Sequence, residues 1–162
     1  MDGMQFQNMF WSRLNGHGDL LGLFDCISDK YFFVKDQSGC YVNANRAFLK
    51  LLNLSQENQL TTLTDQDLFP LDISRQMIDL HEESIQHRKS VQDEFMLILD
   101  GRFRLQWLQC TQVPLYFKDT VIGTAGYFEE IPESARNDKS TEILFTIIKH
   151  IKDKASTDVR VE

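Results

Sequence analysis

The stretch YFFVKDQSGCYVNANRAFLKLL, residues 31–52, decides the fold of this 162-residue chain. Its first five residues are aromatic or β-branched apart from the final lysine, DQSG (36–39) has turn chemistry, and CYVNA (40–44) is typical of a second short strand. Asn45 then stands where a helix N-cap is expected. The stretch therefore predicts a hairpin over 31–44 and a helix after it. The buried face of that helix should hold Ala47, Phe48, Leu51 and Leu52.

The rest of the chain up to residue 131 completes one sheet. A helix is predicted from about Asp72 to Arg88, and three strand-like runs follow it. They are VQDEFMLIL (91–99), RFRLQWLQCTQV (102–113) and TVIGTAGYFEEI (120–131), joined by hairpin connections at 100–101 and 114–119. Five strands with helices between the second and third indicate an α+β fold with one antiparallel sheet.

Amphipathic helices are predicted at both ends of the chain. The first has apolar residues at three- and four-residue steps and stops at NGHGD (15–19); these residues are Phe6, Met9, Phe10 and Leu14. The second, TEILFTIIKHIKDKA (141–155), follows a polar stretch. The chain is thus divided into a helix over 1–18, a central domain over 19–131, and a linker with a signalling helix over 132–162 that leads to a missing output domain.

Composition narrows the function. The net charge of −7 disfavours contact with nucleic acid. No apolar run approaches the ~20 residues of a membrane span, and the N-terminus lacks the features of a secretory signal, so we expect a cytoplasmic protein without membrane contact. Three cysteines without paired short spacing predict reduced thiols. We expect no enzyme, because no phosphate loop, nucleophile motif or pair of catalytic carboxylates is present.

The order of elements resembles the PAS sensory domain. The matching landmarks are FFVKDQSGCYVNANRAFLKLL, TDQDLFP, SVQDEF, the DG turn, WLQCTQVPL and VIGTAGYFEEI, and they cover roughly residues 20–131. The resemblance implies a PAS fold, in which helices cover one face of a five-stranded antiparallel sheet and enclose a pocket for a small molecule. It also implies a sensor that signals to an attached output domain.

The tail resembles the start of an AraC-type DNA-binding domain. The similarity covers ILFTIIKHIKDKASTDVRVE, which ends before a recognition helix could begin. It implies that DNA is bound only through a missing C-terminal domain. The alternative, a plain signalling or dimerisation helix after a PAS domain, stays open.

Two histidines in MIDLHEESIQHR (77–88) raise the question of a metal site. At ~100° per residue, the six-residue step from His81 to His87 separates the two rings by about 120°, so they cannot readily share one ion. Four-residue steps place Met77, His81 and Ile85 on one stripe, which points His81 inward and leaves the glutamates as surface charge.

The position of His81 on this helix raises the question of a bound haem. The resemblance implies that haem-binding PAS domains take their iron ligand from a motif similar to H-x-x-Y-I. The sequence HEESI has Ser84 in place of the tyrosine. His81 is therefore weighed as a satisfied core histidine, as a polar contact to some other ligand, and as an axial haem ligand. No cofactor is identified.

Strand alternation gives two faces, and the resemblance assigns them. Met96, Ile98, Leu108 and Cys110 are taken as pocket-facing, and with His81, Met77 and Ile85 they form the predicted ligand site. Phe103, Leu105 and Trp107 are taken as an outer apolar patch. The first helix is the expected cover, from the same chain or a partner, which gives a predicted dimer interface of Phe6, Phe10, Leu14 and Trp107.

The sequence thus predicts a cytoplasmic, homodimeric PAS sensor that binds a small molecule and relays the change to an attached output domain, as the regulatory part of an AraC-type bacterial transcription regulator. The alternatives are a haem-based gas or redox sensor with His81 as axial ligand, and a ligand-free PAS dimerisation module.

Overall fold

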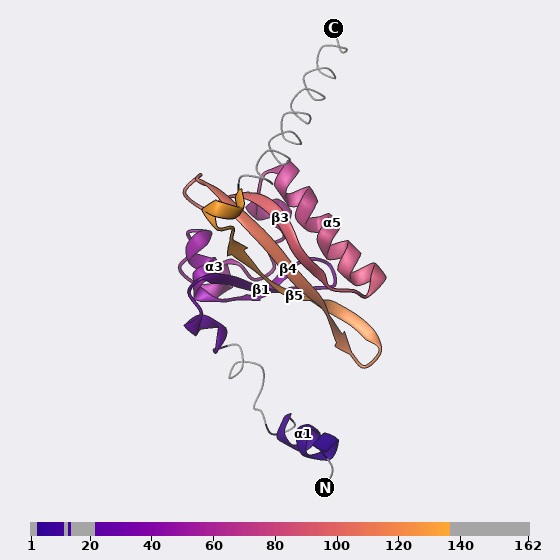
Figure 1. Ribbon diagram of the computed structural model, residues 1–162. Helices are drawn as coiled ribbons and strands as arrows, with labels where there is room; N and C mark the ends of the chain where they lie inside the picture. Colours follow the sequence, from indigo (N-terminus) through magenta and orange to yellow (C-terminus); the bar gives the residue numbers. More distant parts are fainter. Residues whose placement is uncertain (1–2, 12, 14–21, 137–162) are drawn as a thin grey trace. The chain divides into compact units, whose positions relative to one another are not determined.

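The computed structural model describes residues 3–11, 13 and 22–136. Its five strands are β1 (Lys30–Asp36), β2 (Tyr41–Ala44), β3 (Val91–Leu99), β4 (Leu105–Phe117) and β5 (Thr120–Glu130). All neighbouring pairs are antiparallel, in the order β2-β1-β5-β4-β3 (Figure 1). The predicted α+β class and the five-stranded antiparallel sheet are confirmed.

Helices fill the connection between β2 and β3. They are α3 (Arg46–Leu51), the short turn η2 (Glu57–Gln59), α4 (Asp65–Leu68) and α5 (Leu71–His87), and the turn η1 (Phe24–Cys26) precedes β1. Asn45 is the N-cap of α3, as predicted, and its side chain accepts a hydrogen bond from the Phe48 amide. Helix α5 ends at His87, and its C-cap Arg88 has a positive φ of 52°.

The core lies between the sheet and these helices. Helix α5 contacts β3, β4 and β5, whereas α3 contacts β1 (Figure 1). Phe33, Phe48 and Phe128 meet at ring-centroid distances of 5.0–6.1 Å, with Tyr41 beside Phe33 and Phe48. All four side chains are at most 2% exposed, so this aromatic group holds α3 onto the sheet.

The limits predicted for the fourth strand are wrong at both ends. Its first three residues belong to a turn, because the Asp100 carboxylate accepts hydrogen bonds from the amides of Arg102 and Arg104. At the other end β4 continues through Pro114 to Phe117. Proline is accommodated there because β3 pairs only as far as Gln112, which leaves Pro114 with a strand on one side.

The ends of the chain are described only in part. Helix α1 spans Gly3–Trp11, within the predicted first helix, while Leu14 and the predicted helix over 141–155 lie outside the described residues. The domain limits at 18 and 131 therefore stay predictions. Among the described residues, no helix has the length and apolar character needed to cross a membrane.

Candidate functional site

The seven residues predicted to line a ligand site lie on the inner side of the sheet or on α5. Met96, Ile98, Leu108 and Cys110 are at most 2% exposed, and Met77 joins them in one cluster of the core. His81 is 5% exposed and Ile85 is half-buried. The structure thus brings six of the seven into the interior, where a bound molecule would have to displace or replace packing contacts.

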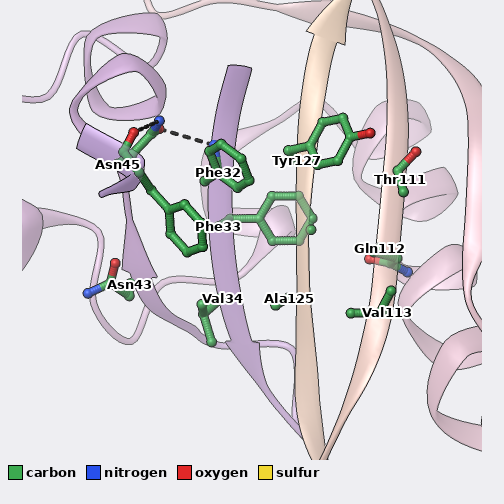
Figure 2. Close-up of a pocket in the computed structure, with 12 residues that line it drawn as sticks. Phe32, Phe33, Val34, Asn43, Asn45, Thr111, Gln112, Val113, Ala125 and Tyr127 are labelled. Carbon is green, nitrogen blue, oxygen red and sulfur yellow. Dashed lines mark hydrogen bonds between the residues drawn. The ribbon is translucent and has the colours of Figure 1, made fainter. Parts of the chain in front are cut away.

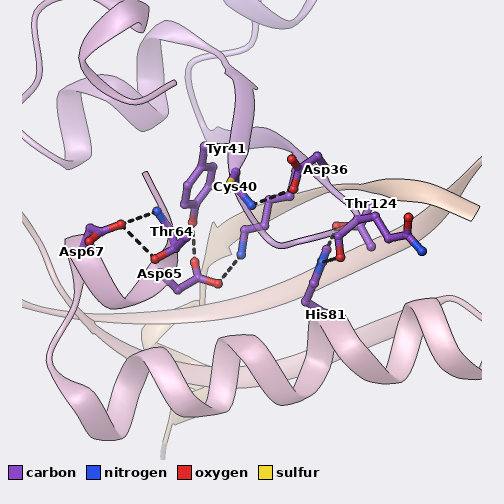
Figure 3. Close-up of polar contacts among 10 residues, drawn as sticks. Asp36, Cys40, Tyr41, Thr64, Asp65, Asp67, His81 and Thr124 are labelled. Atoms are coloured by element: carbon purple, nitrogen blue, oxygen red, sulfur yellow. Dashed lines mark hydrogen bonds and ion pairs between the residues drawn. The ribbon is translucent and has the colours of Figure 1, made fainter. Parts of the chain in front are cut away.

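His81 links α5 to the sheet. Its Nδ1 lies 3.0 Å from Thr124 Oγ1 on β5, and its Nε2 lies 3.4 Å from the Gln37 carbonyl oxygen in the β1–β2 turn (Figure 3). A carbonyl can only accept, so the arrangement suits a neutral ring that donates from Nε2 and accepts the Thr124 hydroxyl proton at Nδ1. Burial, followed by the nearby Lys35 ammonium, lowers the pKa of His81.

A buried ion pair lies close to this histidine. Lys35 Nζ is 2.5 Å from Asp65 Oδ2, and both side chains are 2% exposed. The Tyr41 hydroxyl donates to Asp65 Oδ1 at 2.7 Å (Figure 3), and the Lys35 ammonium lies 4.8 Å from the centre of the Tyr41 ring. Burial and the adjacent Asp65 carboxylate raise the pKa of Tyr41 well above its usual value.

One buried polar group on the same face lacks a partner. Gln112 on β4 is 2% exposed, and its Nε2 donates no hydrogen bond to any of the described residues. A buried amide without a partner costs about 1–3 kcal/mol, so such a group calls for a water or a ligand acceptor. Lys35, Tyr41, Asp65, His81, Gln112 and Thr124 are hereafter the inner polar group.

The cysteine beside this group is not a reactive nucleophile. Burial raises the pKa of the Cys110 thiol to about 12, so the sulfur stays protonated at neutral pH. Its place among apolar side chains suits a packing residue or a wall of a pocket.

The surroundings of His81 do not fit an axial haem ligand. Both ring nitrogens already face hydrogen-bond partners, and Gly39 of the β1–β2 turn packs over the ring, since a Cβ there would lie 3.7 Å from His81 Cδ2. His87 is exposed whereas His81 is buried, so the two rings do not share one site. In the part of the chain that the structure describes, no group of three or more His, Cys, Asp or Glu side chains could hold a metal ion.

The outer face of the sheet carries an apolar hollow of about 190 Å³ (Figure 2). Phe24, Phe32 and Tyr127 provide its aromatic wall, with Phe24 stacked on Phe32 at 4.4 Å between ring centres. Val34, Ala125 and Val113 line it along three neighbouring strands. An exposed apolar surface of this kind is a candidate interface.

Two of the three residues of the predicted outer patch lie in β4: Leu105 is 59% exposed and Trp107 is half-buried. The third, Phe103, is 87% exposed but lies in the turn before the strand, with a φ of +61°. The hollow itself is lined by residues of β1, β4 and β5 that the sequence prediction did not include. Of the predicted interface residues, Phe10 is exposed in α1, and Leu14 lies outside the described residues.

Sequence reasoning missed most of the inner polar group. Lys35 follows Phe33 by two residues, so strand alternation puts both on one face, and Gln112 follows Cys110 in the same way. Strand alternation could therefore have predicted that Lys35 and Gln112 face inward. Asp65 and Thr124 offered none, because their partners come from distant parts of the chain.

Comparison with known proteins identifies the fold. No protein-family model matches the sequence, and no curated protein matches it. Among solved structures, the PAS domain of a Colwellia psychrerythraea protein aligns with a TM-score of 0.56 at 15% identity, covering 69% of this chain and 97% of that one. The PAS domain of Bordetella pertussis BvgS aligns with a TM-score of 0.56 at 17% identity, covering 79% and 98%. This chain has the PAS fold.

A DNA-binding receptor is also among the similar structures. Vibrio cholerae VqmA, described as a dimer in work on LuxR-type receptors, aligns with a TM-score of 0.64 at 18% identity over 72% of this chain. A structure of VqmA bound to DPO aligns with a TM-score of 0.62 at 18% identity over 70% of this chain. The chain spans only 52% and 57% of the length of these two VqmA chains.

Proposed function

We propose that this PAS domain is a sensor that binds a small polar molecule between α5 and the sheet. The observation that carries the proposal is the inner polar group, above all the buried Gln112 Nε2 without an acceptor. A ligand with an oxygen or ring-nitrogen acceptor would satisfy that amide. Met77, His81, Ile85, Met96, Ile98, Leu108 and Cys110 would form the walls. VqmA bound to DPO supports small-molecule binding by this fold.

Signal transfer would use the link between helix and sheet. His81 and Thr124 join α5 to β5, and His81 also holds the β1–β2 turn through Gln37. A ligand that binds better to one arrangement of these contacts shifts the population toward it. The change would pass through residues 132–154 to an output domain.

The output domain is proposed to bind DNA. The tail's resemblance supports an AraC type, whereas VqmA, described among LuxR-type receptors, offers a second model. Because the chain carries a net charge of −7, the 162-residue chain should leave DNA unbound in a mobility-shift assay at physiological salt. Tight binding would overturn the assignment of DNA recognition to a separate domain.

A substitution at Gln112 tests the ligand site. Gln112→Leu removes the unpaired amide, so the ligand-free protein should keep or gain stability. DPO and a panel of small heterocycles should be added in thermal unfolding scans, since a ligand at 100 times its Kd stabilises by about 2.7 kcal/mol. A hit that stabilises the original chain should lose its effect in Gln112→Leu.

The matched control is Gln92→Leu, at an exposed position of β3. It should keep the ligand effect. Equal loss in both variants would contradict a role for Gln112, and the absence of any stabilising ligand would leave a ligand-free dimerisation module as the better description. An absorption spectrum tests the haem alternative, because a Soret band in the purified protein would overturn the poor fit found around His81.

A further inference from the structure

A second hollow lies at the junction of α3 and the β3–β4 hairpin. Its volume is about 330 Å³, and Arg46, Lys50 and Arg102 bring three cations to it. Its other lining residues are Leu49, Asn53, Leu54 and Ser55. Within the part of the chain that the structure describes, no carboxylate lines this hollow, although the whole chain has a net charge of −7. The concentration of positive charge here is therefore local.

The fold holds the two halves of this hollow together. The Gly101 amide donates to the Leu51 carbonyl at 2.9 Å, so the hairpin turn rests on the end of α3. A Cβ at Gly101 would lie 2.2 Å from the Leu52 carbonyl oxygen, which only glycine avoids. The Asp100 carboxylate fixes the turn through the amides of Arg102 and Arg104. Arg102 is thus set beside a helix about fifty residues earlier in the chain.

Two of the three cations lack an acidic partner. Arg46 lies 3.8 Å from Asp25. Among the described residues, no ion pair involves Lys50 or Arg102. The Asn53 side chain likewise has no hydrogen bond in that part of the chain. Its amide, with Lys50 and Arg102, offers donors to an incoming anion.

We propose that this hollow binds a small organic phosphate. Arginine and lysine would contact the phosphoryl oxygens through charge-assisted hydrogen bonds, and Leu49 and Leu54 would contact the organic part. The site shares no residue with the inner polar group, so it provides the domain with a second input. It holds or fails independently of the proposed sensor site.

Titration with phenyl phosphate, followed by amide NMR shifts at low salt, tests this site. Saturable shifts are expected at Lys50, Asn53, Ser55 and Arg102. The double variant Lys50→Gln/Arg102→Gln removes two exposed charges and should weaken binding at least about ten-fold, since it removes two charge-assisted hydrogen bonds that solvent screens only in part. Inorganic phosphate should bind more weakly than phenyl phosphate, because it cannot use the leucines.

The matched control is Arg75→Gln/Lys118→Gln, which lowers the net charge equally at exposed positions outside the hollow. It should change the affinity by less than about two-fold. Equal weakening in both double variants would overturn the proposal, as would shifts that never saturate. Inorganic phosphate binding as tightly as phenyl phosphate would overturn the assignment of an organic ligand.

Discussion

At the scale of single residues, the Lys35–Asp65 pair is the clearest liability in the core. The Lys35 and Asp65 side chains are 2% exposed, so both charges have lost their hydration. Their mutual attraction, together with the hydrogen bond from the Tyr41 hydroxyl, compensates for that loss. Such a pair is weak support for stability as a whole. Removal of only one of the two charges should nonetheless destabilise the domain strongly, because the remaining charge stays buried without a partner.

Lys35→Met should therefore destabilise the domain by about 3–5 kcal/mol in urea unfolding. Lys35→Met/Asp65→Asn removes both charges and keeps an acceptor for Tyr41, so it should recover at least half of that loss. Additive losses in the double variant would show that the two residues do not act as a pair.

His81 should make stability depend on pH. Its pKa is lowered from 6.5 in the folded state, so the unfolded chain binds a proton first as pH falls. The contribution of neutral His81 to the free energy of unfolding is present above about pH 6.5 and is lost as pH falls toward the lowered folded-state pKa. The slope is at most about 1.4 kcal/mol per pH unit. The charged groups that influence the ring are Lys35, Asp65 and Asp36.

Chemical unfolding between pH 5 and 8 measures this dependence. His81→Gln should flatten the curve in that range, whereas His87→Gln, at an exposed position, should leave it unchanged. A curve for His81→Gln that matches the original chain would show that another group controls the pH dependence.

How far the sequence predicts these residues depends on the range of the contacts. The inward direction of His81 follows from four-residue spacing within one helix, a local rule. Its partners Thr124 and Gln37 are more than 40 residues away in the chain, and periodicity carries no information about them. Lys35 is partly predictable from local rules. Strand alternation predicts which face it is on, but its burial depends on Asp65, which comes from another element.

At the scale of elements, Asn45 does more than cap α3. Its Oδ1 accepts from the amides of Phe48 and Phe32, and its Nδ2 donates to the carbonyls of Phe24, Ile27 and Lys30. One side chain thus joins η1, β1 and α3. The sequence predicted the cap, but not the contacts with η1, which depend on tertiary packing.

Asn45→Ala should cost about 2–4 kcal/mol, since a lost cap costs about 1 kcal/mol and each buried group left unpaired adds to it. Asn45→Asp keeps the acceptor oxygen, so its stability should lie between that of the original chain and that of Asn45→Ala. Asn43→Ala, at a half-buried position on the outer face, should stay within about 0.5 kcal/mol in the same urea unfolding measurement. A loss for Asn45→Ala no larger than a simple cap would contradict the joining role.

Strand limits were predicted less well than strand existence. The inserted turn at Asp100 depends on a carboxylate that accepts from two amides, and the extension of β4 past Pro114 depends on where β3 stops pairing. Both depend on neighbouring strands. A prediction from one segment alone therefore places the ends of the strand at the nearest arginine and proline instead.

At the scale of the whole molecule, the outer face of the sheet is the proposed dimer surface. Phe24, which lines the hollow together with Phe32 and Tyr127, follows Leu14 by ten residues. Ten residues can span at most about 36 Å when extended. The helix that carries Phe6 and Phe10 can therefore reach the sheet of its own chain or of a partner.

Deletion of residues 1–18 should leave the protein monomeric, because it would remove the proposed apolar cover of the hollow, and light scattering measures the mass directly. Val113→Glu places a charge in the hollow at a 41% exposed position and should have the same effect with the first helix present. A dimer that survives the deletion but not Val113→Glu would mean that two sheet faces pair directly. A dimer that survives both changes would move the interface away from this face of the molecule.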